Sequence, residues 1–216
     1  MRKFKKFEAI YFLEKEYFVS LVMTKKGKKM ALNIADQYYL KAKGAMAGFC
    51  SDWEEACEAI SYAISYDENH CPSLCLLGKI QAYYLNNYEE AFENFDKSIA
   101  ANINYVQVYP EYIKVLIWAD ELPRAKQLLE FARKIKGVDL AELLWCEAYL
   151  LEMEYKYKQS LKCLKKAKTH TYNDDYTYFI ENEERRIQNK LKKAKKKKSK
   201  SKKKKITKVK FNSILD

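Results

Sequence analysis

The sequence has few of the residues that break helices or build common catalytic sites. Its 216 residues include only five Gly, three Pro and two His. So few Gly and Pro do not suit a many-turned β-sandwich or barrel, and they favour long helices. The sequence contains no glycine-rich phosphate loop and no GxSxG elbow, and two His restrict histidine chemistry. A hydrophobic fraction of 48% nevertheless provides enough apolar mass for a core.

Long apolar runs are also missing, since no stretch approaches the roughly 18 apolar residues of a membrane span. The first residues are basic, as in a secretory signal, but Glu8, Glu14 and Glu16 interrupt the apolar stretches, so we expect no leader. We therefore interpret the six Cys as reduced thiols of an intracellular protein. The expected location is cytoplasmic, or nuclear if the host is a eukaryote, where the lysine run would read as a nuclear signal.

Charge is distributed unevenly along the chain. Residues 185–210 carry 16 Lys or Arg and no acidic residue, and residues 1–29 carry nine basic and three acidic residues. Residues 30–184 carry 16 basic and 25 acidic residues. These sums predict basic ends and an acidic body that does not by itself attract nucleic acid.

A pattern of large, small, large and small residues at helical spacing recurs four times, at steps of 34 or 35 residues. The copies begin at Trp53, Tyr88, Leu122 and Tyr157, and each follows another apolar-periodic stretch. Small residues let a second helix approach closely, so each unit is expected to be an antiparallel helix pair. The eight small residues are Ala56, Ala63, Ala91, Ser98, Ala125, Ala132, Ser160 and Ala167.

This pattern resembles the tetratricopeptide repeat (TPR), most clearly where Leu77-Gly78 precedes Tyr88, and next where Gly44 precedes Trp53. The resemblance covers about residues 37–170. It implies an all-α fold: an α-solenoid of about four TPR-type helix hairpins with a C-terminal capping helix and a basic tail, which we expect to be disordered. The expected segments are an N-terminal segment (1–30), a solenoid (31–170) with repeats at about 37–70, 71–105, 106–138 and 139–170, a capping helix (171–193) and a lysine-rich tail (194–216).

The two ends of the chain are harder to interpret. Residues 1–25 fit a helix or a short hairpin equally well, and they either cover the first repeat or form an arm that docks on a partner. Residues 206–216 regain apolar side chains, which fits a short docking motif as well as chance composition. The capping helix is predicted from one apolar stripe, formed by Tyr172, Tyr176, Phe179, Ile180, Ile187 and Leu191.

Nothing in the pattern indicates catalysis, a metal or a cofactor, so we predict that the chain is not an enzyme. His70, Cys71 and Cys75 are too few and wrongly spaced for a metal centre. Paired acids such as Glu183-Glu184 are interpreted as solvated helix faces rather than as a general acid and base.

In the TPR family the first helices of the units line a concave groove, and the resemblance implies a partner-binding face there. Aromatic rings with interspersed lysines suit peptide recognition. Core packing is the alternative for the tryptophans, and a solvated surface is the alternative for the lysines. The candidate residues are Tyr38, Lys41, Phe49, Lys79, Tyr83, Lys114, Trp118, Trp145 and Tyr149.

The resemblance also argues against one sub-family, the co-chaperone repeats that bind chaperone tails. These repeats grip a C-terminal carboxylate with a Lys/Asn/Arg set. Lys41 matches in type, but Ala45, Leu76, Gln107 and Glu111 stand where the other members are expected.

The tail is almost pure lysine, which neutralises phosphates without reading base edges. The leading hypothesis is a protein–protein adaptor that binds a protein or peptide through the concave face, with the tail for electrostatic attachment. The alternatives are a nucleic-acid- or ribosome-associated factor that binds through the tail, and a structural subunit of a larger assembly. The candidate polyanion-binding residues are Lys192, Lys193, Lys195, Lys196, Lys197, Lys198, Lys200, Lys202, Lys203, Lys204 and Lys205.

Overall fold

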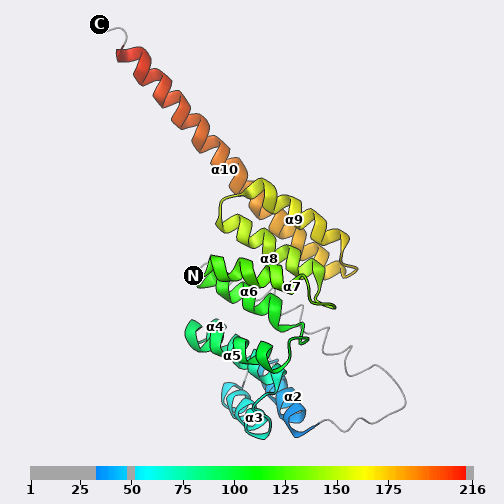
Figure 1. Ribbon diagram of the computed structural model, residues 1–216. Coiled ribbons are helices and arrows are strands. Elements are labelled where there is room, and N and C mark those ends of the chain that lie inside the picture. Colours follow the sequence, from blue (N-terminus) through cyan, green and yellow to red (C-terminus); the bar gives the residue numbers. More distant parts are fainter. Residues whose placement is uncertain (1–32, 48–51, 213–216) are drawn as a thin grey trace. The chain divides into compact units, whose positions relative to one another are not determined.

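The computed structural model describes residues 33–47 and 52–212, with side chains up to residue 195 (Figure 1). Within these ranges the regular structure consists of helices alone, which confirms the predicted all-α helical-repeat class. The chain divides into two compact units between Asp139 and Leu140. The N-terminal segment predicted as a cap or arm, and the candidate Phe49, lie outside the described residues.

The first unit consists of three helix pairs. In each pair the second helix packs along the first, and α2, α4 and α6 also contact one another in sequence. The first helices therefore form one face of this unit. Its helices are α2 (Ile34–Met46), α3 (Trp53–Tyr66), α4 (Cys71–Tyr83), α5 (Tyr88–Ala101), α6 (Val108–Trp118) and α7 (Leu122–Ala132).

The second unit contains one further pair and a long final helix. α8 (Leu140–Met153) packs on α9 (Tyr157–Thr169), and α10 (Asp174–Asn212) packs along α9 (Figure 1). Ile180 and Ile187 of α10 are buried at this contact. α10 thus covers the apolar side that the last pair would otherwise expose.

The repeated pattern marks the second helix of every pair. α3, α5, α7 and α9 begin at the residues that open the four copies, and all eight small residues are 0% exposed. Two of them are serines whose hydroxyls donate to backbone carbonyls of the preceding helix, Ser98 to Cys71 (3.0 Å) and Ser160 to Ala148 (2.7 Å). Serine can replace alanine here because its buried oxygen finds an acceptor.

Three of the turns within the pairs use a residue with a left-handed backbone. These residues are Asn86 (φ 54°), Asp120 (φ 64°) and Tyr155 (φ 60°). Asn and Asp tolerate this conformation because their short polar side chains bond locally, whereas Tyr155 adopts it at a steric cost. The left-handed residue ends the first helix and lets the second return along it.

The C-terminal region differs from the expectation in two respects. Tyr172 precedes α10 and is fully exposed, so it is not part of the capping stripe. The helix also continues through the lysine run to Asn212, whereas we expected it to end near residue 193. No Gly or Pro occurs between Asp174 and Asn212, and lysine is a good helix former. Its propensity offsets the repulsion of like charges, which amounts to only a few tenths of a kcal/mol per pair.

Candidate functional site

The face of α2, α4 and α6 carries a charged cluster centred on Glu111 of α6. Lys114 and Tyr83 each donate a hydrogen bond to the Glu111 carboxylate, and Lys79 lies 4.0 Å from it. The side chains of Lys79, Lys114 and Glu111 are only 15%, 5% and 12% exposed. The two lysines therefore face a carboxylate of their own chain, and the solvated alternative does not describe them.

The electrostatics of this cluster keep Glu111 ionised. Burial alone would raise the pKa of its carboxyl, but Lys114, Lys79 and the hydrogen bond from Tyr83 lower that pKa to about 2. Glu111, which stands where a chaperone-type clamp would have one of its binding residues, is thus the anion of this cluster.

An aromatic pair adjoins the charged cluster. The rings of Tyr83 and Trp118 lie 4.9 Å apart, and both side chains are half-buried. Tyr83 links the two features, since its hydroxyl reaches Glu111. The α4 and α6 candidates Lys79, Tyr83, Lys114 and Trp118 are therefore brought together with Glu111, which sequence reasoning had not counted as a site residue.

The two candidates on α2 lie elsewhere on the first unit. Tyr38 stacks on Tyr62 and Tyr66 of α3, at centroid distances of 5.2 Å and 5.7 Å. Lys41 is exposed and forms an ion pair with Glu55 of α3 at 3.4 Å. Both residues contact the second helix of their own pair, and neither joins the Glu111 cluster.

The candidates on α8 belong to the second unit. Trp145 is buried and packs against Tyr149 (5.8 Å) and against Phe179 of α10 (5.6 Å). This placement favours the core alternative for Trp145. Tyr149 stays half-buried beside it.

Acidic residues of the second unit anchor α10. Glu152 of α8 is 3% exposed and accepts hydrogen bonds from Arg186 (Nη2, 2.6 Å) and Lys190. Arg186 also binds Glu183, and Lys168 of α9 binds Glu184 at 3.1 Å. Burial would raise the pKa of Glu152, but the hydrogen bonds from Arg186 and Lys190 lower it.

This arrangement corrects the interpretation of Glu183-Glu184 as a solvated face. Both side chains are buried, because α10 packs them toward the helix pair. Glu184 pairs with Lys168 of α9 and so holds the helix in place, whereas Glu183 pairs with Arg186 of its own helix and orients the guanidinium that binds Glu152.

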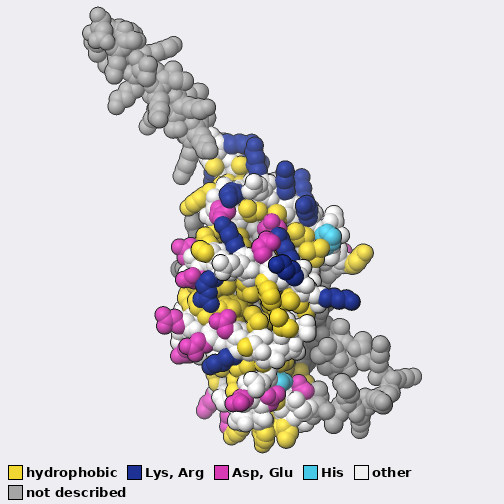
Figure 2. Space-filling view, in the orientation of Figure 1, with side chains coloured by type: hydrophobic (Ala, Val, Ile, Leu, Met, Phe, Trp, Pro, Cys, Tyr) yellow, Lys and Arg dark blue, Asp and Glu magenta, His cyan; other side chains and the backbone are white. Residues whose placement is uncertain are grey.

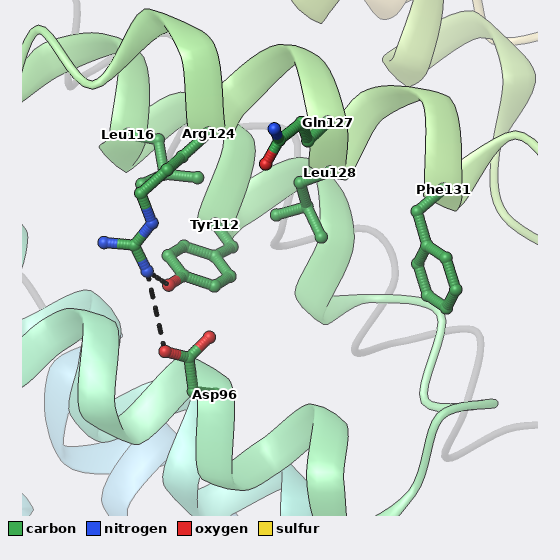
Figure 3. A pocket seen from close by; sticks show the side chains of 7 residues that line it. All are labelled: Asp96, Tyr112, Leu116, Arg124, Gln127, Leu128 and Phe131. Carbon is green, nitrogen blue, oxygen red and sulfur yellow. Dashed lines mark hydrogen bonds and ion pairs between the residues drawn. The ribbon is translucent and has the colours of Figure 1, made fainter.

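A pocket of about 280 Å³ opens between α5, α6 and α7 (Figure 3). Arg124 reaches across it, 2.8 Å from the Tyr112 hydroxyl and 3.6 Å from Asp96, and it also lies over the Phe92 ring. The contacts of the guanidinium are thus made within its own chain, and the remaining pocket wall is mainly apolar. The pocket lining consists of Asp96, Tyr112, Leu116, Arg124, Gln127, Leu128 and Phe131.

The buried cysteines and His70 are part of the helix packing and its hydrogen bonds. Within the described ranges the cysteines are free thiols, and no three His, Cys, Asp or Glu side chains are placed to hold a metal ion. His70 is buried and bridges Ser73 (2.8 Å) and Asp36 (3.1 Å), which ties α2 to the start of α4. No described helix is both long and apolar enough to cross a bilayer.

These features define a TPR-like helical-repeat fold. The structure of MamA (residue 41 to the end) from Desulfovibrio magneticus RS-1 is similar, with a TM-score of 0.52 and 16% sequence identity. The match covers 75% of this chain and 93% of that one. No protein-family description and no curated protein sequence matches the chain. The likeness therefore concerns the fold.

Proposed function

We propose that this chain is a non-catalytic interaction scaffold that binds a partner protein or peptide through the face of α2, α4 and α6. The observation that carries the proposal is the cluster of Tyr83, Trp118 and the Glu111 charge network on adjacent first helices. Half-buried aromatic rings supply contact area with little loss of side-chain entropy, and the surrounding charges supply orientation. The TPR-like fold supports the same conclusion, since stacked helix pairs serve as binding surfaces.

The charge network determines what kind of partner fits. A free carboxylate would have to displace Glu111 from Lys114, and this exchange gains little because one anion replaces another. A partner that donates hydrogen bonds to Glu111, or packs an apolar side chain on Trp118, avoids that exchange. We therefore expect partners other than acidic C-terminal tails.

The test compares Trp118→Ala with Phe131→Ala in the full chain. Phe131 is an exposed aromatic on α7, a second helix, and serves as the matched control. Proteins retained from a nuclease-treated lysate are identified by mass spectrometry, after circular dichroism has shown that both variants are folded. Loss of a central aromatic anchor typically costs about 2 kcal/mol, so we expect retention to fall roughly 30-fold for Trp118→Ala only.

A third chain that ends at residue 195 separates the two binding modes. If the retained set survives Trp118→Ala but disappears with residues 196–216, the lysine segment carries binding and the scaffold proposal is wrong. If the set survives the truncation and is lost with Trp118→Ala, the face of α2, α4 and α6 carries it.

A further inference from the structure

The second unit exposes lysines that the charge sums along the sequence conceal. Lys158, Lys162, Lys165 and Lys166 of α9 are all exposed. Their spacing of four, three and one residues places them on one helix face. None of the four forms an ion pair with a described carboxylate.

Three acids of the same unit are buried rather than exposed beside these lysines. Glu152, Glu183 and Glu184 are buried and paired with Arg186, Lys190 and Lys168. Asp174 and Asp175, in the first turn of α10, and Glu181, which pairs with Lys168, are the exposed acids of α10. The prediction that the body does not attract nucleic acid came from charges summed along residues 30–184, but in this unit three acids are buried in ion pairs whereas the four α9 lysines are exposed.

The α9 lysines lie near the start of the lysine run of α10. Lys168, near the end of α9, pairs with Glu181 and Glu184 early in α10, so the two helices run antiparallel. The start of α9 therefore lies toward the exposed Lys192, Lys193 and Lys195. Figure 2 shows the dark-blue side chains gathered over α9 and the adjoining part of α10.

We propose that the α9 lysine stripe (Lys158, Lys162, Lys165 and Lys166) and the exposed Lys192, Lys193 and Lys195 of α10 form one binding surface for double-stranded nucleic acid, through its phosphates. A duplex carries about one negative charge per 1.7 Å of axis, so a stripe about 12 Å long faces several phosphates. The surface has no element for reading bases, so binding is independent of sequence. This inference concerns residues of the second unit only, so it is tested independently of the proposed function.

The composition of the surface favours a duplex over the other polyanions. A helix that inserts into an anionic membrane needs an apolar face, but the apolar side of α9 is buried against α8 and α10. A single-strand platform needs stacked aromatics, and the sequence has none at 158–166 or 192–205.

The experiment measures binding of a mixed-sequence 20-base-pair duplex to the full chain across a salt series. The test variant changes the four α9 lysines to Gln. A control variant changes four exposed lysines of the first unit (Lys97, Lys126, Lys134 and Lys136) to Gln and so has the same net charge. Each lost phosphate contact reduces the slope of log K against log salt by about 1, so we expect a slope shallower by about 2–3.5 and at least tenfold weaker binding for the test variant alone.

Two further arms make the result decisive. Changing the same four lysines to Arg retains the charge and is expected to retain binding, and circular dichroism of the Gln variant excludes a folding defect. The proposal is overturned if the test and control variants bind the duplex equally. It is also overturned if the chain binds vesicles with one third anionic phospholipid but not the duplex.

Discussion

At the scale of single residues, two glycines that occupy comparable places in the repeat have opposite environments. A Cβ on Gly78 of α4 would lie 3.0 Å from the Phe95 ring and 3.2 Å from the Ala91 carbonyl oxygen. A Cβ on Gly44 of α2 would meet no described atom within 4 Å. Gly78 thus permits the close approach of α4 and α5, whereas Gly44 only weakens its helix.

We expect Gly78→Ala and Gly44→Ala to change stability in opposite directions. The first overpacks a helix contact and should lower the free energy of unfolding by about 1–2 kcal/mol. The second improves helix propensity and should raise it by about 0.5–1 kcal/mol. Urea unfolding followed by helical circular dichroism measures both. Equal effects of the two substitutions would show that Phe95 does not constrain position 78.

At the scale of elements, α10 acts as a cap because both apolar and charged contacts hold it. Ile180 and Ile187 supply buried area, and Arg186 and Lys190 neutralise the buried Glu152. An unpaired buried carboxylate is costly, so the charged contacts restrict where the helix can dock. These contacts, together with that of Phe179 on Trp145, involve residues of α10 from Phe179 to Lys190.

The position of these contacts predicts how truncation affects stability. A chain that ends at residue 195 should unfold with nearly the same free energy as the full chain. A chain that ends at residue 184 loses Ile187 and leaves Glu152 without its basic partners, and we expect a loss of about 4 kcal/mol or more. Thermal and urea unfolding of both chains provide the test. If the chain that ends at residue 184 unfolds with the same free energy as the full chain, α10 is not the cap.

At the scale of the whole molecule, its charge is sorted by burial as well as by sequence. Several acids are internal and paired, whereas most lysines of α9 and the start of α10 lie at the surface. Internal carboxylates that stay ionised make stability depend on acid. Glu111, with a pKa lowered to about 2, is the clearest case.

Glu111 therefore predicts a defined pH window for the Glu111→Gln variant. A carboxyl whose pKa is lower in the folded than in the unfolded chain stabilises the fold fully above about pH 5, and this contribution declines as the pH falls toward 2. At pH 7 the variant should be less stable than the natural chain by about 1.5–3 kcal/mol, the range for hydrogen bonds to a charged group. The two should converge near pH 2 in urea unfolding. A difference that does not change with pH would contradict the role of this ion cluster.

The sequence by itself determined the helix pairs, where their second helices begin, and which small residues are buried. These features follow from local rules, because periodicity and caps act within a few residues of the chain. It also indicated the cap helix, although it misplaced Tyr172 and the end of α10. Tyr172 lies before the first residue of α10, and the helix continues because the propensity of lysine offsets the repulsion of like charges.

Only the tertiary structure decided which charged side chains are exposed and can bind a partner. Lys79 and Lys114 of the predicted groove face Glu111, while the lysines of α9, which the sequence left unremarked, are exposed. Glu152 and Arg186 pair although they are 34 residues apart. A charge looks the same in the sequence whether it is buried and paired or exposed. Its partner comes from another helix, and so packing settles which surface can bind.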